Sequence, residues 1–311
     1  MNTDTISPRD AQWREELRKS RTAKQRTSIP RVKMAELSPD YRITCNEEVN
    51  CGLGKDEAVA EASRCLDCPD PQCVTGCPVN INIPGFIKNI ERGNFQEAAL
   101  VLKETSALPA VCGRVCPQER QCESKCIYNK MKREPVAIGY LERFAADTER
   151  MSGKAAMPAC RPGNGRKIAV VGSGPASLSF AGEMARRGYE VHVFEALHEV
   201  GGVLKYGIPE FRLPNEVVDV EIRALSRMGV KFMTNCVVGK TLGYDDLVAQ
   251  GFEGMFVASG AGLPRFMGIP GENLVGVMSS NEYLTRVNLM GAGSKGWATP
   301  VLRGKRVAVI G

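Results

Sequence analysis

Two runs of closely spaced cysteines constrain what this sequence can fold into more than any other feature. In chain order the thiols are those of Cys65, Cys68, Cys73 and Cys77, then Cys112, Cys116, Cys122 and Cys126. No histidine lies near them, and Pro78 directly follows the first run. Ligand sets made only of thiols, with a Cys-Pro ending, are typical of iron–sulfur proteins. The sequence therefore predicts two [4Fe–4S] clusters.

The spacing also predicts how the thiols divide between the clusters. A C-x2-C-x4-C loop can bind three irons of one cluster, and the fourth cysteine of such a run often binds a neighbouring cluster. Cys65, Cys68 and Cys73 are therefore expected to share a cluster with one cysteine of the second run. Cys77 is expected to join the rest of that run, and a count of thiols alone would include Cys112 there.

Zinc and disulfides are the alternative uses of these thiols. Structural zinc sites usually pair one C-x2-C with another or with histidines, and the later spacings here differ from that pattern. Disulfides belong to oxidising compartments, whereas the N-terminus has neither the basic nor the apolar region of a secretory signal. Since no apolar run is long enough to cross a bilayer, we expect a cytoplasmic protein with no membrane partner.

The positive charge of the chain is concentrated near its start. The net charge is +6, and the segment from Arg9 to Lys33 holds nine Lys or Arg against three acids, which is the same excess. Such an arm is most often solvated, although Trp13 and Leu17 are four apart and would allow a short helix packed on this protein or on a partner. Aromatic residues are not interleaved with the charges, so no nucleic-acid partner is expected.

A dinucleotide-binding pattern begins at residue 167. A buried strand, 167–171, runs into Gly172 and Gly174, a helix follows, and a second strand, 190–194, ends at Glu195. In such a unit the first glycine forms a tight turn, the second lets the backbone approach a pyrophosphate, and the acid binds a ribose hydroxyl. Ser177 stands where a third glycine is usual and is small enough for the same helix–strand packing.

Further features favour FAD as the dinucleotide. Gly201 and Gly202 follow the acid and can admit a second approach of backbone to phosphate, although an ordinary glycine turn is the alternative. A strand predicted at 253–260 ends in Ser-Gly at the carboxyl edge of the sheet, where a cofactor would lie. Residues 304–311 repeat the pattern of 165–172, so a second Rossmann unit is predicted to begin there and to be cut off.

These patterns predict a multidomain protein in which an α-helical domain with two clusters precedes an α/β Rossmann-like domain. The helices are predicted at 55–62, 84–90, 94–103, 117–126 and 138–151. The expected organisation is a basic arm (1–40), a helical Fe–S domain (41–150), a linker (151–166), a FAD-binding domain (167–303) and the first strand of a truncated NAD(P)H-binding domain (304–311). No catalytic side chain is expected, since His192 and His198 suit packing or solvated roles and the cofactors would carry the chemistry.

The chain resembles the small (beta) subunit of NADPH-dependent glutamate synthase. It is also similar to the large subunit of NADH-dependent ferredoxin:NADP+ oxidoreductase and to the N-terminal part of dihydropyrimidine dehydrogenase. The resemblance runs from about Glu48 to the end of the chain, and its most specific stretches are 73–79, 112–118 and 206–214.

The resemblance implies ligands and contacts beyond those that spacing indicates. It implies that Cys65, Cys68, Cys73 and Cys126 bind one cluster, and that Cys77, Cys116, Cys122 and the carboxylate of Glu142 bind the other. It implies FAD contacts at Gly172, Gly174, Pro175, Ala176, Glu195, Gly202, Val203 and Arg212. It places NADPH on the second Rossmann unit, which this sequence lacks.

The function that this resemblance implies is electron entry. Hydride from NADPH would pass to FAD, and electrons would leave through the clusters to a partner subunit that makes glutamate from glutamine and 2-oxoglutarate. A bifurcating ferredoxin:NADP+ oxidoreductase subunit is the alternative within this class. A metal-stabilised interaction module without catalysis is the alternative of another class.

Overall fold

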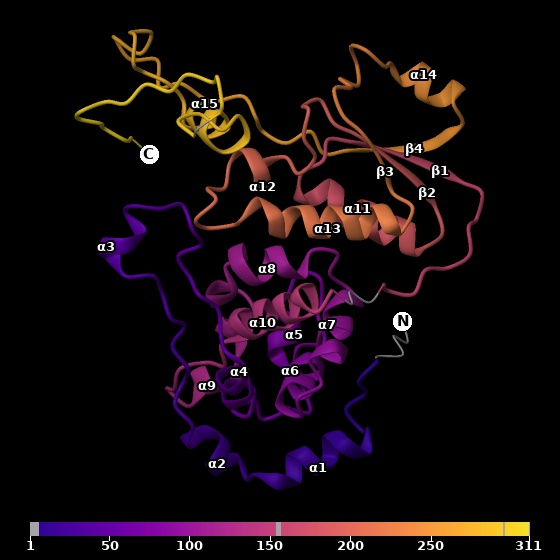
Figure 1. Ribbon diagram of the computed structural model, residues 1–311. Helices are drawn as coiled ribbons and strands as arrows, with labels where there is room; N and C mark the ends of the chain where they lie inside the picture. Colours follow the sequence, from indigo (N-terminus) through magenta and orange to yellow (C-terminus); the bar gives the residue numbers. More distant parts are fainter. Residues whose placement is uncertain (1–5, 154–156, 295, 311) are drawn as a thin grey trace.

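The computed structural model describes residues 6–153, 157–294 and 296–310. The first five residues of the predicted arm, part of the predicted linker and Gly311 lie outside this range. The described chain forms a helical N-terminal unit and a C-terminal unit built on a parallel sheet, stacked on one another (Figure 1).

The N-terminal unit packs short helices around one apolar core. Its helices are α1 (Gln12–Ser20), α2 (Ala23–Ser28), α3 (Pro39–Arg42), α4 (Lys55–Ala62), α5 (Gln72–Thr75), α6 (Ile83–Glu91), α7 (Phe95–Lys103), α8 (Pro109–Val115), α9 (Ile127–Lys130) and α10 (Ile138–Met151). The core joins α4, α6, α7 and α10 through side chains such as Phe86, Ile90 and Leu141, each at most 1% exposed. Asn94 caps α7 by accepting a hydrogen bond from the Glu97 amide, as the capping pattern predicts.

The helix predicted at 117–126 is wrong. Two 3-10 turns occupy this stretch, η1 (Gln118–Arg120) and η2 (Glu123–Lys125), and the backbone of Cys126 is extended. A continuous helix would stack Cys122 and Cys126 on one face, one turn apart. The broken backbone instead directs these two thiols to different sites, which propensity alone does not reveal.

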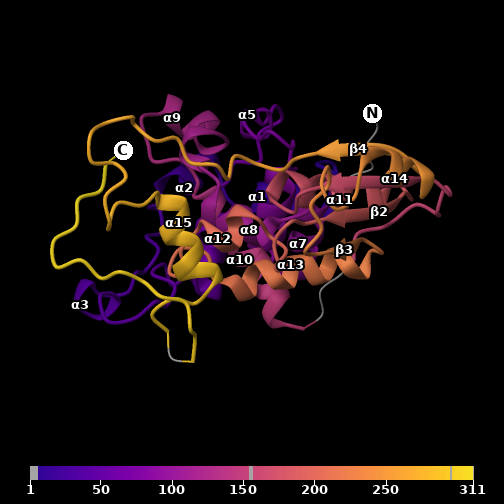
Figure 2. The same cartoon turned by 90° about the horizontal axis from the view of Figure 1, so that it is seen from above.

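The C-terminal unit holds a four-stranded parallel sheet in the order β3-β2-β1-β4. Its elements are β1 (Lys167–Val171), α11 (Pro175–Arg186), β2 (Glu190–Phe194), α12 (Val203–Tyr206), α13 (Asn215–Arg227), β3 (Lys231–Met233), α14 (Tyr244–Ala249), β4 (Phe252–Val257), α15 (Ser280–Leu284) and the π-helix η3 (Thr285–Leu289). Side chains alternate across β1, so that Val170 packs with α11 and α13 while Ala169 packs with α14. Figure 2 shows α15 and the segment after it at the opposite end of this unit from α14.

The predicted strand at 304–311 does not appear within 304–310, which is exposed and has no strand pairing. A parallel strand is held by hydrogen bonds to a neighbour, and the described chain supplies none there. The second Rossmann unit therefore stays a prediction. No helix in the described ranges combines the length and the apolar character needed to span a bilayer.

The two units share a continuous apolar core. Leu108, Val111 and Ala146 of the helical unit pack with Val170 and Leu178 of the sheet unit. At the centre of the contact, α13 lies against α8 (Figure 1). The buried Glu221 of α13 accepts a hydrogen bond of 2.8 Å from the Ala110 amide of α8. The contact is therefore part of the folded core and fixes α8 relative to the sheet.

Glu221 makes the stability of this contact depend on pH. Burial raises the pKa of its carboxyl from 4.5 to about 7. Because the folded protein favours the protonated form of Glu221, this group stabilises the fold fully at pH values below the pKa that the carboxyl has in the unfolded chain. The stabilisation is lost as pH rises through 7. At pH 9 the carboxylate is expected to cost about 3 kcal/mol relative to its protonated form.

Glu221→Gln keeps the acceptor but cannot ionise, so its free energy of unfolding should exceed that of the wild type by this amount at pH 9 and match it at pH 4. Urea denaturation at both pH values measures the difference, and equal values at pH 9 would contradict the assignment.

Candidate functional site

Four of the predicted cluster ligands converge on one cavity in the helical unit. Cys65, Cys68, Cys73 and Cys126 line a space of about 270 Å³. Cys65 follows α4, Cys73 lies in α5 and Cys126 precedes α9, so the thiols come from separate short elements. Apolar side chains of α6 and α10, including Ile83, Ile87 and Ile138, complete the lining. Free thiols around an apolar space fit a polynuclear iron–sulfur group.

The other predicted ligands lie in a second group. Burial raises the pKa of the Cys122 thiol, and Glu123, Glu142, Cys77 and Cys116 are near enough to raise it further. Glu142 lies on α10, and its Oε1 is buried without a hydrogen-bond partner among the described residues. Burial raises the pKa of this carboxyl to about 8, although a hydrogen bond with Gln118 lowers the pKa and offsets part of the rise. An orphaned buried oxygen beside three thiols fits a metal ligand.

Cys112, the alternative eighth ligand, has different surroundings. It lies on α8, and its thiol interacts with Ser106, Cys116, Glu142 and Glu221. Cys77 acts on the nearby Cys116 of the same stretch. The Cys112 side chain thus borders the second group on the side toward the sheet unit.

Burial disfavours the ionised form of thiols in both groups. Burial raises the pKa of the Cys65 and Cys116 thiols to about 11 and raises those of Cys73, Cys112 and Cys122 further. In the described ranges no three His, Cys, Asp or Glu side chains close around a point that could hold a single metal ion. Binding of iron would have to displace the thiol protons, so loading is expected to release protons.

A larger cavity of about 1500 Å³ lies at the carboxyl ends of the strands. The predicted contacts Gly172, Gly174, Pro175, Ala176, Glu195, Gly202 and Val203 all line it. Ala258 to Gly262, after β4, line the same space, as the predicted strand end implies. Gly201 and Arg212 do not line it, and the side chain of Arg212 is exposed.

The glycines of the turn differ in what they require. Gly172 has φ +94°, and a Cβ there would lie 2.5 Å from the Ala258 carbonyl oxygen. Gly174 has φ −69°, and a Cβ there would meet nothing within 4 Å. Gly172 is therefore needed for the fold, whereas the space beside Gly174 opens into the cavity. Gly202 also approaches this turn, since its Cβ would lie 2.8 Å from the Gly174 Cα.

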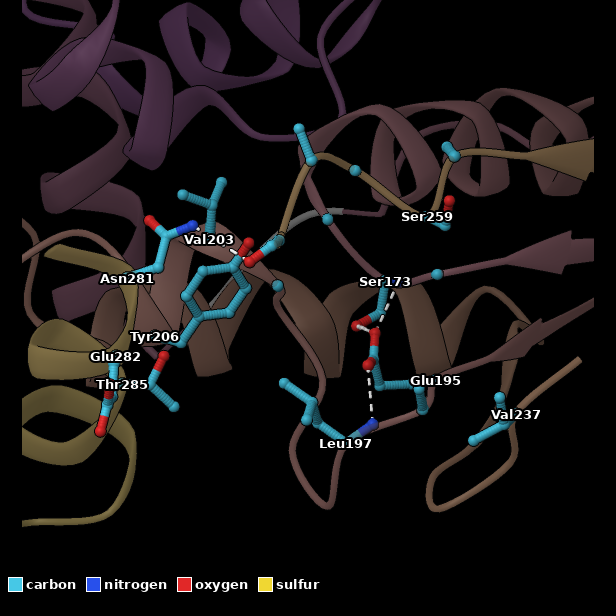
Figure 3. Close-up of a pocket in the computed structure, with 18 of the residues that line it drawn as sticks. Ser173, Glu195, Leu197, Val203, Tyr206, Val237, Ser259, Asn281, Glu282 and Thr285 are labelled. Atoms are coloured by element: carbon cyan, nitrogen blue, oxygen red, sulfur yellow. Dashed lines mark hydrogen bonds between the residues drawn. The ribbon is translucent and has the colours of Figure 1, made fainter. Parts of the chain in front are cut away.

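Glu195 holds the turn and the second strand together (Figure 3). Its Oε2 accepts hydrogen bonds of 2.9 Å from the Ser173 amide and 2.5 Å from the Ser173 hydroxyl, and its Oε1 accepts one of 2.8 Å from the Leu197 amide. The Ser173 Oγ in turn accepts a bond from the Gly201 amide, which explains the burial of Gly201 behind the cavity wall. A carboxylate oxygen can accept two hydrogen bonds, so Oε1 retains one for a ligand hydroxyl.

Sequence reasoning missed the far wall of this cavity. Tyr206, Asn281, Glu282 and Thr285, from α12, α15 and η3, face the glycine turn across the space (Figure 3). Asn281, Glu282 and Thr285 belong to no motif in the sequence, whereas Tyr206 opens the stretch 206–214 but was not predicted to line the site. Only the fold brings the first three opposite Gly172, which precedes them by more than a hundred residues.

Two family models match the chain in the same order as the two units. Residues 42–154 match dihydropyrimidine dehydrogenase domain II, 4Fe-4S cluster, and residues 170–232 match NAD(P)-binding Rossmann-like domain. The glutamate synthase [NADPH] small chain of Azospirillum brasilense is 32% identical over 289 residues, which are 90% of this chain and 60% of that protein. The chain is thus similar to a glutamate synthase small chain over nine tenths of its length.

Other relatives widen the group. The UacF protein of Escherichia coli is 36% identical over 281 residues, covering 89% of this chain and 44% of that protein. The NAD-dependent dihydropyrimidine dehydrogenase subunit PreT of Escherichia coli is 40% identical over 214 residues, covering 67% and 51%. The chain thus spans about half the length of the curated relatives it matches. The predicted resemblance to glutamate synthase small subunits and to dihydropyrimidine dehydrogenase is confirmed, as is a 4Fe-4S domain followed by an NAD(P)-binding Rossmann-like domain.

Proposed function

We propose that this chain belongs to an NADPH-oxidising subunit that passes electrons through FAD and two [4Fe–4S] clusters to a partner subunit of the glutamate synthase type. The partner would use them to make glutamate from glutamine and 2-oxoglutarate. A bound flavin accepts hydride and releases single electrons, and iron–sulfur clusters carry electrons one at a time.

The observation that carries this proposal is the direct packing of the thiol-bearing unit on the unit that holds the dinucleotide cavity. Cys116 directly follows helix α8, which lies against α13 of the sheet unit. The group of Cys77, Cys116, Cys122 and Glu142 is therefore proposed to receive electrons from the flavin. The group of Cys65, Cys68, Cys73 and Cys126 is proposed to pass them outward.

The residues of the large cavity support a dinucleotide with two phosphates. Gly174 lies next to Gly202, so two backbone segments approach one place without side chains. The N-terminus of α11 begins directly after Gly174 and favours negative charge there. We propose FAD in this cavity, with Glu195 Oε1 on a ribose hydroxyl. We also propose that Arg212 contacts FAD. Its side chain is exposed and does not line the cavity, so this contact requires the side chain to change conformation.

A second candidate is an electron-entry subunit for pyrimidine reduction. The 40% identity to PreT, which is described as an NAD-dependent dihydropyrimidine dehydrogenase subunit, favours it. The proposed internal path would be the same, and the partner subunit and the nicotinamide would differ. Copurification of the natural-length protein with its partner, followed by assay with NADPH or NADH, separates the two candidates.

The proposed cofactors can be counted directly. Anaerobically purified protein of natural length is expected to contain about eight iron and eight sulfide per chain together with one FAD. Inductively coupled plasma analysis, acid-labile sulfide determination and chromatography of the released flavin measure these. Zinc without sulfide or flavin would overturn the proposal and leave a metal-stabilised interaction module.

A further inference from the structure

The basic N-terminal arm folds back onto the loop that carries Cys65 and Cys68. Helices α1 and α2 lie along the end of the molecule farthest from the sheet (Figure 1). The sequence favoured a solvated arm, yet the side chains of Arg14 and Arg26 are each only 2% exposed. The structure therefore supports the alternative of an arm that packs on its own protein, with its charges directed inward.

Asp67, between the two cysteines, is the first point at which the arm holds the loop. Its carboxylate is fully buried and receives the Arg14 Nε at 2.9 Å and the Arg18 Nη1 at 2.8 Å. Its backbone has φ +52°, a conformation that costs free energy outside glycine. A buried carboxylate without a partner is strongly destabilising, so this loop conformation depends on the two arginines of α1.

The second point of attachment lies at Cys65 itself. The Arg26 Nη1 donates to the Ser63 carbonyl at 2.7 Å and to Glu91 Oε1 at 2.7 Å. The fully buried Lys88 donates from its Nζ to the Cys65 carbonyl and to Glu91 Oε2, both at 2.6 Å. The carbonyls of Ser63 and Cys65 are thus fixed by cations that α2 and α6 supply together.

We propose that the N-terminal arm is a strap that holds Cys65 and Cys68 in position for the first cluster, and that Arg14 and Arg18 are positioning residues for that site. This inference rests on the proposed function, because it requires that these thiols bind a cluster. Arginine suits the role, since two planar guanidinium groups can pair with one carboxylate while their charges remain fixed at any ordinary pH.

The test compares two variants that each remove two positive charges from the arm. Arg14→Ala with Arg18→Ala removes the contacts to Asp67, whereas Lys19→Ala with Lys24→Ala removes exposed charges that do not touch the loop. The arginine variant is expected to fall from about eight iron to about four and to lose one of two cluster signals in electron paramagnetic resonance, with FAD retained. The lysine variant should keep all of these. Equal iron in the two variants would overturn the strap, whereas a wild type without iron would instead overturn the proposed function.

A second pair keeps the test decisive if the arginine variant does not fold. Arg14→Gln leaves Asp67 underpaired, whereas Arg14→Gln combined with Asp67→Asn leaves an amide pair with no buried charge. The single variant should lose about half its iron, and the double variant should regain most of it, because the two positions interact directly. If the double variant held no more iron than the single one, the arm contact would not position the loop.

Discussion

Cys116→Ala is expected to remove about half of the iron from the loaded protein, leaving about four per chain, while FAD stays bound. Cys116 lies near Cys77, Cys122 and Glu142 and does not line the cavity of the other four thiols. Loss of one of its few protein ligands should release that cluster, because alanine offers no replacement donor. Iron and sulfide analysis of the purified variant measures the loss, and unchanged iron would contradict the ligand assignment.

Cys112→Ala is the matched control for this experiment. Cys112 is also a partly buried thiol, four residues earlier at the adjacent turn of α8, and it interacts with both Cys116 and Glu142. If Glu142 is the eighth ligand, Cys112→Ala should keep about eight iron, whereas Glu142→Ala should lose about four. The reverse result would make Cys112 the ligand and leave Glu142 as a buried acid with one unpaired oxygen. The two variants therefore decide a question that the spacing of the cysteines leaves open.

The parts of this molecule that sequence predicted are those that local spacing encodes. The cysteine runs, the turn at Gly172 and the acid at Glu195 each lie within a short stretch whose chemistry demands particular residues. The predicted ten-residue helix at 117–126 is wrong because helix propensity does not register that the backbone turns between Cys122 and Cys126 and is extended at Cys126. Strand β3 was missed because three residues are too few to show alternation.

Contacts between distant residues were beyond the reach of the same reasoning. The pairing of Arg14 with Asp67 joins positions 53 apart, and nothing in either stretch names its partner. The sequence shows that the arm is basic, but it does not show whether the arginine side chains point to solvent or into the protein. A solvated helix and a helix whose arginines pair with a buried acid have the same composition. Tyr206 and Asn281 likewise face the dinucleotide turn only because α12 and α15 are folded across it.

Gly174→Ala is expected to weaken FAD binding by roughly a hundredfold while the fold stays intact. A Cβ at this position meets no protein atom within 4 Å, and the backbone conformation is open to any residue. The added methyl group would instead occupy cavity space where a pyrophosphate has to approach the backbone. Replacing the N-cap glycine of α11 by alanine weakens the cap of that helix. Alanine also reduces the conformational entropy of the unfolded chain, which stabilises the folded protein. These effects oppose one another, so the melting temperature should change by only a few degrees.

Two further glycines make this result interpretable. Gly172→Ala places a Cβ against the Ala258 carbonyl at a positive φ, so it should destabilise the fold by roughly 1–3 kcal/mol and weaken flavin binding as a consequence. Gly163→Ala lies outside the cavity in open space and should change neither property. Calorimetric titration with FAD and thermal unfolding of the three variants separate a blocked site from a damaged fold. If Gly174→Ala bound FAD as the wild type does, the pyrophosphate would have to lie elsewhere, because only a ligand close to that backbone is sensitive to one methyl group.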